Sequence, residues 1–160
     1  MVVRGVALTQ KAKGKHIITS QIEHPAIVEA LHFLEQNFGI EVTYLPVDHH
    51  GLVDPADVAA AIRPDTILVT VMFANNEVGT IQPSKAIGEI CHQQHVLFHT
   101  DASQAVGKVP IDVAHLQVDF LTVAGHKIYA PKGIGALYIR DGLQLEPLLH
   151  GASQENGRRA

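Results

Sequence analysis

The sequence predicts an α/β domain whose mostly parallel sheet is covered by helices on both faces. Short apolar segments typical of buried strands alternate with amphipathic helical segments at least three times. The strongest strand signal, residues 66–73, is apolar on both faces, as is usual inside a parallel sheet. With 160 residues, 46% of them hydrophobic, the chain is long enough to bury a substantial core.

The predicted elements follow one another in a regular order along the chain. The predicted strands are residues 16–20, 41–47, 66–73, 96–102, 120–123 and 135–139. The predicted helices are residues 1–8, 25–38, 55–63 and 83–91, with a further short helix after Pro110. Pro25 suits the first position of a helix, and Gly39 suits its end. In the third helix, Val58, Ala59 and Ile62 are expected on the inner face.

Composition narrows the class of protein. The net charge is −4, which gives no sign of nucleic-acid binding or of attraction to an anionic membrane. The longest apolar runs are far shorter than the roughly 20 residues that a membrane-spanning helix needs. The single cysteine, Cys91, rules out an internal disulfide bond and indicates a reducing, cytoplasmic setting. Cys91 lies within an amphipathic pattern and is expected in the core.

Polar side chains recur at the points where predicted strands end. His24, Asn75 with Asn76, Asp101 with Gln104, and His126 with Lys127 each come just after a strand. Because the carboxyl ends of parallel strands meet at one edge of a sheet, and ligands bind beyond that edge, these residues are expected to converge on one site.

Lysine forms Schiff bases with carbonyl groups, including that of pyridoxal phosphate (PLP). Lys127, directly after an apolar strand, is a candidate for this role, although most lysines are solvated loop residues. Asp101 is suited to pair with the protonated nitrogen of a pyridine ring, or else caps the next turn. Each of these alternatives is open on the residues alone.

Three more side chains carry a functional and a structural interpretation each. His24 precedes a helix start, so it either caps that helix or stacks on a flat heterocycle. Asn76 and Gln104 are neutral hydrogen-bonding groups suited to a phenolic oxygen, or else they stabilise turns. His49, His50, His92 and His95 lack partners at metal-ligand spacing and are expected on the surface, so no metal site is predicted.

Five ordered sequence blocks together resemble the cysteine desulfurase and selenocysteine lyase group of the class V aminotransferase family. The blocks are residues 19–24 (TSQIEH), 74–79 (ANNEVG), 99–108 (HTDASQAVGK), 124–135 (AGHKIYAPKGIG) and 150–160 (HGASQENGRRA). The resemblance implies a PLP enzyme of fold type I, with residues 1–160 forming the central part of its large domain. An N-terminal segment and a C-terminal small domain are expected to be missing.

Residue roles follow from the resemblance rather than from spacing. It implies that Lys127 binds PLP and that His24 stacks on the ring and relays protons, which makes these two the catalytic candidates. Asp101 is expected to pair with the ring nitrogen, and Asn76 and Gln104 to bond its phenolic oxygen. His126 is expected to hold the phosphate group. Relatives often carry a serine two residues before that histidine, where this chain has Ala124, which removes one phosphate contact.

The implied activity is removal of sulfur from L-cysteine to give L-alanine and an enzyme persulfide, for iron–sulfur cluster or thio-cofactor assembly. A selenocysteine lyase acting on L-selenocysteine, or another class V lyase, is an alternative. The resemblance also implies a homodimer and a sulfur-acceptor or scaffold protein as partners. The loop with the sulfur-accepting cysteine, and the arginine that binds the substrate carboxylate, lie further along in relatives. A non-catalytic binding or dimerisation module is therefore a further alternative.

Overall fold

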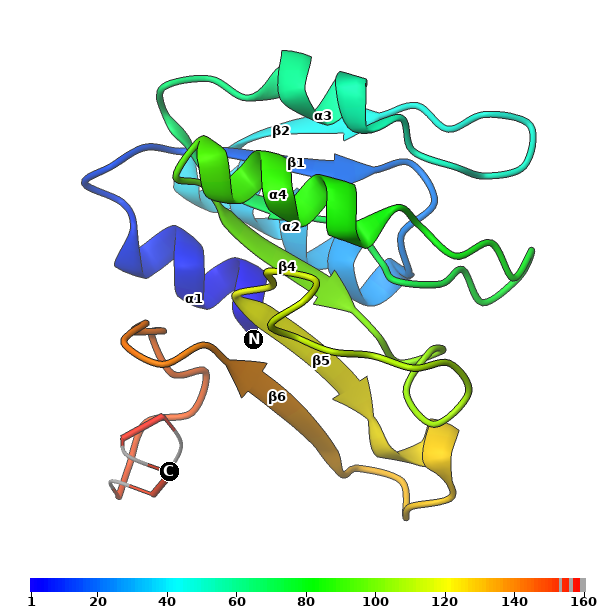
Figure 1. Cartoon of the computed structure of the whole chain (residues 1–160). Coiled ribbons are helices and arrows are strands. Elements are labelled where there is room, and N and C mark those ends of the chain that lie inside the picture. The colour runs from blue at the N-terminus through cyan, green and yellow to red at the C-terminus, as the bar shows by residue number, and fades with distance from the viewer. Residues whose placement is uncertain (153, 156, 159–160) are drawn as a thin grey trace.

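A six-stranded sheet forms the centre of the computed structural model, which describes residues 1–152, 154–155 and 157–158 (Figure 1). The spatial order of the strands is β2-β1-β3-β4-β5-β6. Their bounds are β1 His16–Ser20, β2 Glu41–Leu45, β3 Thr66–Thr70, β4 Leu97–Asp101, β5 Phe120–Ala124 and β6 Gly135–Ile139. The first five are parallel, and β6 pairs antiparallel with β5. The predicted α/β class with a mostly parallel sheet is confirmed.

Helices cover both faces of the sheet, and each face has its own apolar core. The helices are α1 Val2–Thr9, α2 Pro25–Phe38, α3 Pro55–Ala61 and α4 Ser84–Gln93. α1 and α2 pack on one face, in a core that includes Leu31 and Phe120. α3 and α4 pack on the other face, in a core that includes Val58 and Phe98. Each strand contributes side chains to both cores because successive side chains of a strand point to opposite faces of the sheet.

The ends of α2 are set by the residues that the sequence singled out. Pro25 occupies the first turn, where its missing N–H leaves no carbonyl unpaired. Gly39 has a φ angle of 65° and closes the helix in the left-handed conformation that glycine tolerates. This start and stop place His24 at the carboxyl edge of the sheet, immediately after β1 and its loop.

Several local predictions differ from the structure. No regular helix follows Pro110, because the single turn that Asp112 caps through the backbone N–H groups of Ala114 and His115 ends at Gln117, whose φ angle is 53°. Strand β3 ends at Thr70, earlier than predicted, although the next residues stay buried. Ala59 is exposed, whereas Val58 is buried and Ile62 is partly buried against the same core, as expected.

Two buried histidines join neighbouring strands through threonine side chains. Nδ1 of His16 lies 2.8 Å from Oγ1 of Thr66, and its Nε2 lies 2.8 Å from Oγ1 of Thr43. His99 of β4 bridges Thr70 of β3 and Thr122 of β5 at 2.8 and 2.9 Å. Both histidines are fully buried, so each ring nitrogen has its hydrogen-bond partner inside the sheet.

The polypeptide after β6 packs back on the first helix. Leu145 is buried, and its side chain leaves no room for a Cβ on Gly5 of α1. The N–H of Glu146 donates to Oγ1 of Thr9. The segment that contains Leu145 and Glu146 is therefore packed against the rest of the domain. Ser153, Asn156, Arg159 and Ala160 of the fifth sequence block lie outside the described residues. Within the described part of the chain, no helix has the length and apolarity to cross a membrane.

Candidate active site

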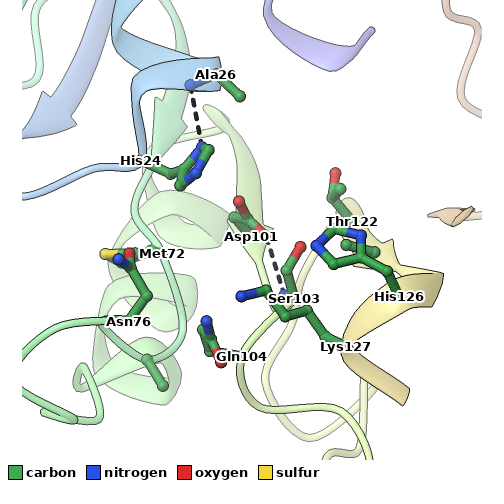
Figure 2. A pocket seen from close by; sticks show the side chains of 12 residues that line it. His24, Ala26, Met72, Asn76, Asp101, Ser103, Gln104, Thr122, His126 and Lys127 are labelled. Carbon is green, nitrogen blue, oxygen red and sulfur yellow. Dashed lines mark hydrogen bonds between the residues drawn. The ribbon is translucent and has the colours of Figure 1, made fainter. Parts of the chain in front are cut away.

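A cavity of about 300 Å³ opens at the carboxyl edge of the sheet (Figure 2). Its wall comes from the segments that follow β1, β3, β4 and β5. The lining residues are His24, Ala26, Met72, Ala74, Asn76, Asp101, Ser103, Gln104, Thr122, Ala124, His126 and Lys127. All six predicted site residues are among them, so the expected convergence occurs. The roles assigned to these residues remain predictions.

His24 is at once a helix cap and part of the cavity wall. Its Nδ1 accepts the backbone N–H of Ala26 at 3.1 Å, in the first turn of α2 (Figure 2). A nitrogen that accepts a hydrogen bond carries no proton, so the neutral imidazole holds its proton on Nε2. Nε2 can therefore donate a hydrogen bond to a ligand while the cap stays intact, whereas uptake of a proton by the ring requires Nδ1 to leave the cap.

Asp101 likewise forms the cap that the sequence allowed and also lies in the cavity wall. Its Oδ1 accepts the backbone N–H of Ser103 at 2.9 Å, which caps the turn after β4. The residue also lines the cavity, at the end of a buried strand. In Gln104, Oε1 accepts Lys108 Nζ at 2.9 Å, so its amide NH₂ is the group left to donate to a ligand.

Asn75 shapes the loop that presents Asn76. Its Oδ1 accepts the N–H groups of Glu77 and Val78, and its Nδ2 donates to the carbonyl oxygen of Ile22. These bonds stabilise the turn after β3 and tie it to the loop after β1. Asn76 is exposed and reaches the cavity. Both asparagines were candidates from the sequence, but only Asn76 lines the cavity, whereas Asn75 stabilises the turn.

His126 and Lys127 lie on a single turn of 3-10 helix, η1 Gly125–Ile128, which the sequence did not predict. Two close backbone approaches require glycine here. A Cβ on Gly125 would lie 2.7 Å from the carbonyl oxygen of Ile134, and one on Gly135 would lie 2.6 Å from that of Val123. The tight β5–η1–β6 turn therefore fixes where the two basic side chains stand at the cavity mouth (Figure 2).

Sequence reasoning missed several residues at or beside the cavity. The cavity is also lined by Met72, Ser103 and Thr122, which were not predicted. Their closeness along the chain to Ala74, Asp101 and Ala124 is the only sequence signal that could have suggested them. Glu23 is 7% exposed and its Oε1 accepts the backbone N–H of Met72 at 2.8 Å. His99 does not line the cavity but is hydrogen-bonded to Thr122, which does. Partners so distant along the chain leave no local pattern.

Burial shifts the two hidden titratable groups in opposite directions. It raises the pKa of Glu23 to about 7, opposed by the bonds from Ser20 and Met72 and helped by the charge of Asp101. It lowers the pKa of His99 to about 4, although Asp101 acts against this shift. Both groups are therefore largely neutral in the folded protein near pH 6, above the pKa of His99 and below that of Glu23.

The donor set of the cavity fits PLP. Asp101 supplies an acceptor for a ring N–H, and Gln104 and Asn76 supply amide donors for a ring oxygen. Alanine and methionine side chains offer apolar surface to a flat ring, while His126 and Lys127 offer basic groups to a phosphate and an aldehyde. Ala124 provides no hydroxyl, and the Thr122 hydroxyl is already bonded to His99. Among the described residues, no group of three or more acidic, histidine or cysteine side chains is placed to bind a metal ion.

Comparison with known proteins gives the family. The Aminotransferase class-V family model matches residues 1–156, and the chain belongs to this family, whose members depend on PLP. The chain is 54% identical to the cysteine desulfurase IscS of Dictyoglomus turgidum and 56% identical to that of Methanosarcina thermophila. These matches cover 100% and 99% of the chain but 40% and 39% of the relatives.

Solved structures agree with this assignment. A structure described as SspA in complex with cysteine has a TM-score of 0.94 at 45% identity, over 98% of this chain and 46% of that one. A NifS-like protein has a TM-score of 0.94 at 41% identity, over 99% of this chain and 44% of that one. The fold is therefore that of the cysteine desulfurases, and the chain spans about two fifths of the length of the curated relatives it matches.

Proposed function

We propose that this chain is the cofactor-binding part of a PLP-dependent cysteine desulfurase, with PLP held by Lys127. The observation that supports this most is the convergence of six side chains from four strand ends on one cavity. Each alone has an ordinary structural explanation, as the caps formed by His24 and Asp101 illustrate. Their common location, with chemistry that matches one cofactor, favours a binding site.

Bound PLP supplies an electron sink for negative charge that develops on the α-carbon of an amino acid. Asp101 strengthens this property because its carboxylate favours a proton on the ring nitrogen. Gln104 and Asn76 orient the ring through amide N–H groups directed at its phenolic oxygen. His126 holds the phosphate group by hydrogen bonding, without help from Ala124.

Proton transfer is assigned to two groups on opposite walls of the cavity. His24 presents Nε2–H as a hydrogen-bond donor while Nδ1 caps α2, and it takes up a proton at Nδ1 when that nitrogen leaves the cap. The cap holds the resting imidazole in one tautomer and orientation, and release of Nδ1 frees the ring to act as a general acid or base. The amine of Lys127 would hold the cofactor, and as a free amine it would accept or donate a proton.

The substrate proposed is L-cysteine, with L-selenocysteine as the alternative. The names of the relatives and the cysteine bound in one similar structure favour cysteine. A homodimer, a sulfur-acceptor or scaffold protein, and a cytoplasmic location belong to the same proposal.

A titration with PLP tests the cofactor site. The chain is expected to develop the visible absorbance of lysine-bound PLP, and Lys127→Ala is expected to abolish it. Asp101→Asn should weaken binding, while Lys132→Ala, at an exposed lysine nearby, serves as the matched control. A folded chain without this absorbance would contradict the proposal and favour a non-catalytic module. Addition of L-cysteine or L-selenocysteine to the loaded chain, with alanine as the readout, then separates the two substrates.

A further inference from the structure

Glu23 is a buried carboxyl group beside the cavity for which the proposed mechanism has no use. It directly precedes His24 in the loop between β1 and α2, and it is 7% exposed. Its Oε1 accepts two hydrogen bonds, from Ser20 Oγ at 2.7 Å and from the backbone N–H of Met72 at 2.8 Å. Its Oε2 is buried without a hydrogen-bond partner among the described residues.

The bond to Met72 crosses the wall of the cavity. Met72 and His24 both line it, but they belong to different strand ends. Glu23 therefore connects the loop that carries His24 to the end of β3. The bond from Asn75 Nδ2 to the carbonyl of Ile22 is a second connection between the same two loops. The side chain of Glu23 is in this way placed to determine where His24 stands.

The environment of Glu23 disfavours a negative charge. Removing a carboxylate from water without a cation beside it is costly, and no cation is bonded to Glu23 within the described residues. The charged group that acts on it is Asp101 at the end of β4, which has the same sign. The other titratable side chains of the cavity are His24 on the same loop and His126 and Lys127 on η1.

We propose that Glu23 is a positioning residue that holds His24 on the cavity wall, and that it does so as a neutral carboxylic acid coupled to the charge of Asp101. As the acid, Glu23 keeps both hydrogen bonds at Oε1 without bringing a second negative charge to the edge of the sheet where Asp101 lies. The inference about His24 deepens the proposed function and rests on it, whereas the protonation of Glu23 is a property of the chain itself.

The tautomer of His24 is a direct readout of its position. Nitrogen NMR of the imidazole is expected to show a proton on Nε2 and an unprotonated Nδ1 in the natural chain, because Nδ1 accepts from Ala26. In Glu23→Ala the ring should leave this arrangement and show mixed tautomers. Glu23→Gln, which mimics the neutral acid, should restore the natural spectrum. Glu29→Gln, with a 76% exposed side chain on α2, is the matched control.

Unfolding by urea tests the protonation separately. Between about pH 5 and about pH 8, the folded natural chain binds a proton at Glu23 that the unfolded chain has largely lost, and this stabilising contribution disappears as the pH rises. The unfolding constant of the natural chain, divided by that of Glu23→Gln, is therefore expected to rise on the order of 10²-fold over this range. Asp101→Asn should move this change to lower pH. A natural His24 spectrum in Glu23→Ala would overturn the positioning role, and a constant ratio would overturn the neutral acid. Neither readout needs PLP, so failure of PLP binding would count against the proposed function alone.

Discussion

Replacement of His99 by glutamine is expected to change the pH dependence of stability in a defined direction. His99 is fully buried between β3 and β5, and burial lowers its pKa to about 4. An unfolded histidine has a pKa of about 6.5. Between these values the unfolded chain binds one more proton than the folded chain. Stability from neutral His99 is therefore present above about pH 6.5 and is lost as the pH falls toward 4.

The size of the effect follows from the two pKa values. A difference of about 2.5 units corresponds to about 3 kcal/mol in the free energy of unfolding. Glu23 acts in the opposite direction over an overlapping range, because its raised pKa makes the folded chain bind the extra proton up to about pH 7. In the natural chain, the effects of His99 and Glu23 on the pH dependence of stability nearly cancel between about pH 4.5 and 6.5. A variant that lacks one of the two groups should therefore show the pH dependence caused by the other.

Urea unfolding across this pH range measures both contributions. His99→Gln keeps a donor and an acceptor for Thr70 and Thr122 but does not titrate, so its stability should fall with rising pH by about 3 kcal/mol relative to the natural chain. Exposed His92→Gln should follow the natural curve. Parallel curves for His99→Gln and the natural chain would refute the reasoning, as would an NMR titration of His99 near pH 6.5.

Two further predictions concern packing around α4. Gly88→Ala should destabilise the chain by about 1 to 3 kcal/mol in urea unfolding. The added Cβ would lie 2.0 Å from the carbonyl oxygen of Leu116, so the backbone must move. Equal or higher stability of the variant would contradict this contact. Cys91 should resist alkylation in the folded chain and react only on unfolding. Its side chain is 1% exposed, and burial raises the pKa of its thiol to about 12. Rapid labelling under native conditions would count against its place in the core.

The sequence predicted the parts of the fold that depend on local patterns. Residues 66–73 indicated a central strand because they are mostly apolar on both faces, and Pro25 and Gly39 marked the bounds of α2. The convergence of polar strand ends needed only the parallel order of the strands. The prediction of a short helix after Pro110 was wrong because the backbone leaves helical geometry at Gln117, after the single turn that Asp112 caps.

The hidden polar groups of the site could not be predicted in this way. Glu23 bonds to a residue 49 positions away, and His99 bonds to threonines 29 and 23 positions away. Such partners become neighbours only when the sheet forms, so neither their burial nor their shifted pKa values have a signature in the local sequence. The turn η1 was likewise missed, because close backbone contacts to Gly125 and Gly135 define it.

The central claim is that Lys127 is the residue to which PLP binds. Reduction of the PLP-treated chain with borohydride fixes the attached cofactor, and peptide mass spectrometry then identifies the modified residue. The account predicts modification at Lys127, lost in Lys127→Ala and unchanged in Lys132→Arg. Modification spread over Lys108, Lys132 and the other surface lysines, or none at all in the folded chain, would contradict it.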